Sequence, residues 1–261
     1  MTEESGNPEV TVKKHGGVAT VTLARPSLST TAKSALRDAL ADVSADESIR
    51  AAVLTGTGKA FCVGQDLAEH AAALEADPAT AFTTIAEHYN PIVTALATMP
   101  KPVVAAINGT CVGAGLGFAL ACDVRIASES ARFGTAFTGI ALAPDSGLSV
   151  SLARAVGVAR ASELILLAET FTAADALAWG VVCKLAPADD LPVAAQKLAT
   201  RLATGPTQAY AEAKAALAAA YPLAEALDRE GAAQARLGST VDHQHAVKAF
   251  LAKEKPEFTG R

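Results

Sequence analysis

A glycine-rich segment is the first place where residue types and spacing could do chemistry. Gly113, Gly115 and Gly117 open a predicted helix shortly after a predicted strand. The N-terminus of a helix presents unpaired backbone N–H groups and the positive end of the helix dipole, which together suit negative charge on an oxygen. The spacing is not the G-x-G-x-x-G of a dinucleotide site. The glycines therefore indicate either close helix packing or a backbone N–H site, and both interpretations stay open.

Asp145 is the second candidate, because it lies between an apolar run and a helix. Within residues 142–147 (Leu-Ala-Pro-Asp-Ser-Gly) it precedes a helix predicted to begin at Leu148. An aspartate in this setting is either a helix-cap or turn residue, or an acid–base group. The sequence has no G-x-S-x-G motif, and His243 and His245 do not share a helix face. Neither a serine nucleophile nor a metal site is therefore predicted.

Composition restricts the classes of partner. The 261 residues are 51% hydrophobic, with a formal net charge of -5, which predicts a buried core and gives no electrostatic footprint for nucleic acid or an anionic membrane. Residues 102–122 carry no charge but include a turn and glycines, which favours a buried strand and helix over a membrane span. Residues 1–8 do not resemble a signal peptide, and the four cysteines form no C-x-x-C pair. A cytoplasmic location with reduced thiols is expected.

The order of elements predicts an α/β fold. Residues 10–14 and 18–23 alternate apolar and polar side chains around a glycine turn, which indicates a hairpin. Further strands and helices are expected to alternate up to about residue 185, with helix breaks near Asp77-Pro78 and Asn90-Pro91. Residues 189–253 contain no strand-like run. The expected division is a core over 1–188, which holds the active site, and a helical C-terminal region over 189–261.

Two long segments resemble a known family. They are residues 58–67 (Gly-Lys-Ala-Phe-Cys-Val-Gly-Gln-Asp-Leu) and 101–127 (Lys-Pro-Val-Val-Ala-Ala-Ile-Asn-Gly-Thr-Cys-Val-Gly-Ala-Gly-Leu-Gly-Phe-Ala-Leu-Ala-Cys-Asp-Val-Arg-Ile-Ala). Both are similar to the signature of the enoyl-CoA hydratase/isomerase (crotonase) superfamily, and the resemblance extends from near Val10 to Gly260. It implies an α/β fold of the ClpP/crotonase-like type, a spiral of ββα units with a helical C-terminal trimerisation region. The implied partners are an acyl-CoA thioester substrate and a homotrimer or dimer of trimers; coenzyme A is part of the substrate, and no separate cofactor is implied.

The resemblance also implies an oxyanion hole made by two backbone N–H groups, which fall on Gln65 and Ala114. Such preorganised donors stabilise a thioester oxygen as it becomes an enolate. Hydratases of the family use two glutamates to add water, and the corresponding positions here are Gly117 and Phe137. Because both carboxylates are absent, hydration by the usual two-glutamate route is not expected.

Residues 133–147 around Asp145 resemble a narrower branch, the phenylacetate-pathway isomerases, in which a catalytic aspartate occupies this position. A single carboxylate suits an isomerase, because one group can remove a proton from one carbon and return it two carbons away. The resemblance implies a substrate pocket that includes Gly117 and an apolar wall of Phe133, Phe137 and Leu142. It also implies contacts to coenzyme A from Arg25, Leu28, Cys62, Val63, Phe250 and Lys253. Thr30-Thr31 stands where the family usually has Asn-Ala, a departure in the same pocket.

Four functions follow from these residues. The first is an acyl-CoA isomerase with Asp145 as proton shuttle. The second is an enoyl-CoA hydratase that uses Asp145 alone with an ordered water. The third is a dehalogenase-like enzyme with Asp145 as nucleophile and His88 as base. The fourth is a non-catalytic acyl-CoA-binding homologue.

Overall fold

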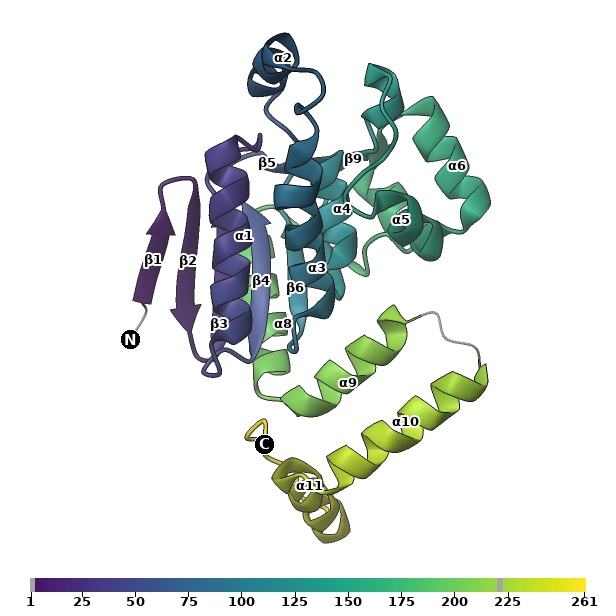
Figure 1. Ribbon diagram of the computed structural model, residues 1–261. Helices are drawn as coiled ribbons and strands as arrows, with labels where there is room; N and C mark the ends of the chain where they lie inside the picture. Colours follow the sequence, from purple (N-terminus) through teal and green to yellow (C-terminus); the bar gives the residue numbers. More distant parts are fainter. Residues whose placement is uncertain (1–2, 220–222) are drawn as a thin grey trace.

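A seven-stranded sheet organises the molecule in a computed structural model, which describes residues 3–219 and 223–261 (Figure 1). Its strands lie in the order β1-β2-β3-β4-β6-β8-β11. The first three strands are antiparallel and the others parallel. Their bounds are β1 Glu3–Asn7, β2 Val10–His15, β3 Val18–Leu23, β4 Ala51–Gly56, β6 Val103–Ile107, β8 Val124–Ser128 and β11 Lys184–Ala186. The predicted hairpin is confirmed, since His15 pairs with Val18 across the turn.

A smaller sheet adds short strands at one end of the first. Its order is β10-β9-β7-β5, with bounds β10 Phe171–Thr172, β9 Arg132–Gly134, β7 Thr110–Val112 and β5 Ala60–Cys62. Strands β5, β7 and β9 pair in parallel. Each follows a strand of the large sheet by a tight turn, which gives the repeated ββα units of the crotonase fold.

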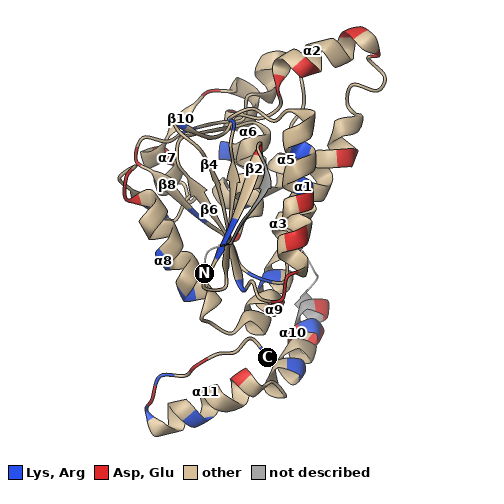
Figure 2. Ribbon diagram, turned by 90° about the vertical axis from the view of Figure 1, so that its left-hand side faces the viewer, with Lys and Arg blue, Asp and Glu red and all other residues tan. Residues whose placement is uncertain are grey.

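Helices cover both faces of the large sheet (Figures 1 and 2). Side chains alternate along the central strands, so Leu54 and Ala105 face one core cluster while Val53 and Val104 face the other. The first cluster packs beneath α1, α3 and α4, and the second beneath α8. The helices of the core are α1 Thr30–Ala45, α2 Leu67–Ala76, α3 Asn90–Thr98, α4 Ala114–Ala121, α5 Leu148–Val156, α6 Val158–Leu167, α7 Ala173–Ala178 and α8 Leu191–Ala203.

Helix α8 lies beyond residue 188, where the expected core ends, and yet it packs on the large sheet. Leu191, Ala195 and Ala199 of α8 are buried against the sheet, so this helix covers one face of the core. The helical character predicted for 189–253 is confirmed in the described residues. Without α8 the large sheet would expose one apolar face, and the division at residue 188 stays a prediction.

The remaining helices form an arm that projects from the core (Figures 1 and 2). It comprises α9 Thr207–Ala218, α10 Leu223–Gly238 and α11 Val241–Ala252. The chain end returns towards the core, where the Arg50 guanidinium donates to the Phe258 carbonyl at 2.9 Å. Asp242 also accepts from the backbone N–H groups of Thr259 and Gly260. These bonds hold the arm and the C-terminal segment to one another and to the core.

A π-helical turn replaces one of the expected helix breaks. Residues Ile85–Tyr89 are π-helical and continue directly into α3 at Asn90. Pro91 lacks an N–H donor, and the first turn of a helix is where that loss matters least. The Asn90-Pro91 pair therefore marks a change of helix type, not the end of a helix. Among the described residues, no helix is both long and apolar enough to cross a membrane.

Candidate active site

Gln65 lies where the chain leaves β5 and runs beside Leu28. The Leu28 N–H donates to the Gly64 carbonyl at 2.8 Å, and the Asp66 N–H donates to the Leu28 carbonyl at 3.1 Å. Because successive backbone groups of an extended chain point to opposite sides, the Gln65 N–H points away from Leu28. The N-terminus of α4 is close by, since a Cβ on Gly64 would lie 3.6 Å from the Ala114 nitrogen.

Ala114 is the first residue of α4 and presents an N–H group that the helix itself does not use. The preceding residue, Gly113, has a φ of 59° and no side chain that could cap the helix. Gly115 packs directly on β5, where a Cβ would overlap the Cys62 carbonyl. The glycines therefore allow close packing, and no side chain of Gly113 occupies the Ala114 N–H. That the N–H groups of Gln65 and Ala114 bind one oxygen together stays a prediction.

Asp145 occupies a tight turn before α5. The next two residues, Ser146 and Gly147, have φ values of 53° and 68° in the left-handed region, and Gly147 is the N-cap of α5. Asp145 is therefore a turn residue and not the helix cap, and its role as an acid–base group stays a prediction. Its carboxylate is partly buried and accepts a hydrogen bond of 2.7 Å from the Ser146 hydroxyl. Burial raises the pKa of Asp145 above the usual aspartate range, and the Ser146 hydrogen bond opposes that rise.

Gly117 joins this turn to the helix that carries Ala114. A Cβ on Gly117 would lie 2.7 Å from both the Cβ and the carbonyl oxygen of Ser146. Residues three apart on a helix share a face. Ala114 and Gly117 therefore lie on the same face of α4, and Gly117 packs against the Asp145 turn. The structure thus places the carboxylate turn beside the helix start that holds one of the two N–H donors.

Replacing Gly117 by alanine is expected to destabilise the protein by about 1–3 kcal/mol, because the added methyl group overlaps the Ser146 backbone. Denaturant unfolding measures this. The matched control is Gly231→Ala within α10, where an added Cβ meets nothing within 4 Å. That variant is expected to gain about 0.5–1 kcal/mol, since alanine favours a helix interior over glycine. Equal stability changes in the two variants would contradict the packing described here.

The three residues of the predicted apolar wall, Phe133, Phe137 and Leu142, have different surroundings. Phe137 begins a 3-10 turn, Phe137–Ile140, and its carbonyl accepts from the Leu142 N–H at 3.0 Å. Both side chains pack with the main core cluster. Phe133 is fully buried and stacks on Phe171, with ring centroids 5.3 Å apart. Phe133 therefore belongs to an aromatic cluster of the core, and its role as a wall of the substrate pocket stays a prediction.

A family model described as enoyl-CoA hydratase/isomerase matches residues 13–261. The chain belongs to this family. A probable enoyl-CoA hydratase of Rhodobacter capsulatus is 41% identical, covering 94% of this chain and 95% of its own. The 1,2-epoxyphenylacetyl-CoA isomerase of Escherichia coli is 39% identical, covering 94% and 96%. A crystal structure from Mycobacterium abscessus, assigned as an enoyl-CoA hydratase/isomerase, is 49% identical with a TM-score of 0.92, and the match covers 100% of both chains.

In this member of the enoyl-CoA hydratase/isomerase family, four of the residues predicted to bind coenzyme A lie in or beside the loops around Gln65. Two of them are exposed and two are buried. Val63 is 37% exposed, and Arg25 is exposed and lies 3.7 Å from the Glu9 carboxylate. Leu28 and Cys62 are fully buried, and burial raises the pKa of the Cys62 thiol to about 12. Any contact of Leu28 or Cys62 with coenzyme A would therefore come from the backbone.

Phe250 and Lys253 lie apart from the other residues that are expected to contact coenzyme A. Both lie at the end of α11, on the projecting arm, whereas α2 and β5 near Gln65 lie at the opposite end of the molecule (Figure 1). They do not approach the Arg25 and Val63 region of the same chain, because α10 carries the chain away from it. The Phe250 side chain is 82% exposed. Contacts of these residues with coenzyme A would need a second copy of the chain.

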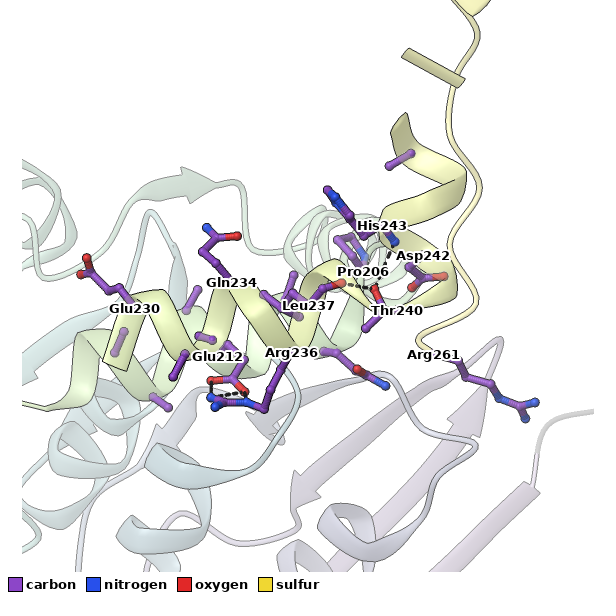
Figure 3. Close-up of a pocket in the computed structure, with 18 of the residues that line it drawn as sticks. Pro206, Glu212, Glu230, Gln234, Arg236, Leu237, Thr240, Asp242, His243 and Arg261 are labelled. Atoms are coloured by element: carbon purple, nitrogen blue, oxygen red, sulfur yellow. Dashed lines mark hydrogen bonds and ion pairs between the residues drawn. The ribbon is translucent and has the colours of Figure 1, made fainter. Parts of the chain in front are cut away.

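A cavity of about 720 Å³ lies between α9, α10 and α11, away from the predicted site (Figure 3). Alanine is the most frequent residue in its lining, which also includes Leu237, His243 and the ion pair of Arg236 with Glu212. It contains none of the predicted catalytic or oxyanion residues.

His88 does not fit the role of base for Asp145. Its Nε2 lies 3.1 Å from the Ser34 hydroxyl and its Nδ1 lies 3.2 Å from the Thr84 hydroxyl. Burial, more than the nearby Lys33 charge, lowers the pKa of His88. Both ring nitrogens are thus engaged on the α1 side. The neighbouring residue Tyr89 was not singled out from the sequence. Burial raises the pKa of Tyr89, and the Asp145 charge adds to that rise.

Proposed function

We propose that the protein is an acyl-CoA thioester isomerase in which Asp145 transfers the proton and the N–H groups of Gln65 and Ala114 hold the thioester oxygen. The observation that carries the proposal is the packing of Ser146 on Gly117. It sets the Asp145 turn against the face of α4 that begins with Ala114. A carboxylate and a pair of backbone donors on opposite sides of one small space are what enolate chemistry requires.

The reaction balances within the substrate. The Asp145 carboxylate removes a proton from the carbon between the thioester carbonyl and a 3,4 double bond. The electron pair moves onto the thioester oxygen, where the two N–H groups stabilise the negative charge as a dienolate. Asp145, now protonated, returns the proton to the carbon two positions further along the chain. The double bond ends conjugated with the thioester, and no redox cofactor is needed because no electrons leave the substrate.

Two features favour isomerisation over hydration. Gly117 and Phe137 stand where the family resemblance expects the two glutamates of a hydratase, and the packing on Ser146 leaves no room for a side chain at Gly117. Asp145 thus lacks the companion acid that would position a water. The likeness to the isomerase of Escherichia coli supports the same direction, and likeness to the hydratase of Rhodobacter capsulatus is the reason to test it.

A product screen across straight-chain and aromatic 3-enoyl-CoA thioesters tests the proposal. We expect conversion to 2-enoyl-CoA, which is measured by the absorbance of the conjugated thioester. Release of 3-hydroxyacyl-CoA from crotonyl-CoA as the faster reaction would support a hydratase instead. Tight binding of the thioesters with no turnover on any of them would support a non-catalytic acyl-CoA-binding protein.

Replacing Ser146 by alanine is expected to move the acid limb of the kcat/KM–pH profile to higher pH. Asp145 must be ionised to accept a proton, so activity falls as pH decreases through its pKa. The Ser146 hydrogen bond lowers that pKa against the rise caused by burial, so losing the bond raises it further. Substrate turnover across pH 4–8 measures the limb. An unchanged or lower limb would show that another group controls proton transfer.

We also propose a homotrimer, or a dimer of such trimers, in which the arm of one chain meets a neighbour. Phe250 and Leu251 on α11 and Leu217 on α9 are between 77% and 85% exposed, more apolar exposure than single surface positions need. A second copy would cover them and would bring Phe250 and Lys253 towards another chain's coenzyme A. Sedimentation equilibrium is expected to give three or six times the chain mass of 26.4 kDa; a monomer would contradict the proposal.

A further inference from the structure

Tyr89 has a buried hydroxyl group that no described residue satisfies. The side chain is 1% exposed, and its Oη is a buried polar atom with no hydrogen-bond partner among the residues that the structure describes. Buried polar groups in folded proteins are nearly always hydrogen-bonded, because leaving one unpaired costs its hydration without replacement. A buried hydroxyl with no partner among the described residues is therefore a candidate contact for a bound molecule.

The position of Tyr89 connects it with the site. Its ring packs against Phe118, the residue after Gly117 on α4, with centroids 6.0 Å apart. Val93 lies one helical turn further along the same face, and its Cγ1 is 3.5 Å from the place a Cβ on Gly147 would occupy. This side of α3 therefore faces both α4 and the turn that carries Asp145. The influence of the Asp145 charge on the pKa of Tyr89 agrees with that placement.

Neighbouring groups leave the Tyr89 hydroxyl available as a donor. The Lys33 ammonium lies over the ring, 5.5 Å from its centroid, and donates to the Thr84 hydroxyl at 2.8 Å. The Asp145 Oδ1 accepts from Ser146. Burial raises the pKa of Tyr89, so the phenol keeps its proton at neutral pH. A neutral O–H in an apolar setting is suited to bind an oxygen of an incoming molecule.

We propose that the Tyr89 hydroxyl hydrogen-bonds an oxygen atom carried by the acyl group, so that the enzyme prefers acyl-CoA esters with a hydroxyl, keto or ether oxygen beyond the reacting carbons. This inference rests on the proposed isomerase function, whose reaction places the acyl chain between Asp145 and α4. A purely hydrocarbon acyl chain would leave the hydroxyl unpaired in the complex. Sites with a buried polar group discriminate against ligands that cannot pair with it.

The test compares matched substrates on the wild-type enzyme and on Tyr89→Phe. The substrates are 3-hexenoyl-CoA and its 5-hydroxy and 6-hydroxy derivatives, and the readout is the ratio of kcat/KM between each oxygenated substrate and the plain one. We expect the wild type to prefer at least one oxygenated substrate by about 10- to 100-fold. The ratio should fall to near one in Tyr89→Phe, which removes only the hydroxyl.

A ratio that is unchanged in Tyr89→Phe, or a wild type with no preference, would overturn the inference while isomerisation itself remains. Parallel losses on both substrates would also overturn it, since they indicate a structural role. If the wild type isomerises none of them, the proposed function fails, and binding of hexanoyl-CoA and 6-hydroxyhexanoyl-CoA by calorimetry still tests the preference. The wild-type comparison also stands should Tyr89→Phe fold poorly, which its thermal unfolding would reveal.

Discussion

Asp145→Asn is expected to lower kcat for 3-enoyl-CoA isomerisation by about 10²- to 10⁴-fold, the range for removing a general acid–base group. Asparagine has nearly the same shape and can still accept the Ser146 hydrogen bond seen at 2.7 Å. It cannot accept a substrate proton. The loss should therefore come from the chemical step and not from a rearranged turn.

Binding provides the control for this variant. Asp145 does not anchor coenzyme A in the proposed complex, so the Kd for a saturated acyl-CoA should change only a few-fold. Thermal unfolding should be similar or slightly higher, since the partly buried carboxylate becomes neutral. Turnover close to that of the wild type would show that Asp145 is not the proton shuttle.

Ala114→Pro is expected to lower kcat/KM by about 10²- to 10³-fold, because it removes one N–H donor of the oxyanion hole. Proline is well tolerated at the first position of a helix, where its missing N–H has no helical partner. Ala114 holds that position in α4, so the helix should remain while the donor is lost. Rates on 3-enoyl-CoA substrates, with circular dichroism to confirm folding, measure the effect.

Two matched variants separate the backbone donors from side-chain effects. Ala114→Gly keeps the N–H and removes only the methyl group, so it should cost far less than Ala114→Pro. Gln65→Ala also keeps its N–H, and the Gln65 side chain contacts only His70, at 3.3 Å, among the bonds described. A loss in Gln65→Ala as large as in Ala114→Pro would indicate that the side chain, not the backbone, acts on the substrate.

Local patterns were sufficient to predict much of the fold. The alternation at residues 10–23 specified the hairpin, and the glycines at 113–117 placed the start of α4, because both features act over a few neighbouring residues. The π-helical turn at Ile85–Tyr89 was not foreseen, since a proline after it normally suggests that a helix ends. The surface that helix α8 covers was left open, because an amphipathic pattern does not reveal which partner a helix packs on.

The candidate site was predictable only in part, because several of its contacts join residues that are far apart in the chain. The Gln65 and Ala114 positions followed from family resemblance, and the structure shows that Gly64, next to Gln65, lies close to the Ala114 nitrogen. The contact of Gly117 with Ser146 joins residues far apart in the chain, and no short pattern encodes it. The same holds for the unpaired Tyr89 hydroxyl. Contact of Phe250 and Lys253 with coenzyme A stays a prediction, because sequence cannot tell whether such an arm reaches another copy of the chain.

Product analysis in H₂¹⁸O tests the central claim most directly: one carboxylate moves a proton and adds no water. The enzyme is incubated with a 3-enoyl-CoA, the products are separated, and their masses are measured by mass spectrometry. The account predicts 2-enoyl-CoA without ¹⁸O as the main product. A main product of 3-hydroxyacyl-CoA that carries one ¹⁸O atom would contradict it.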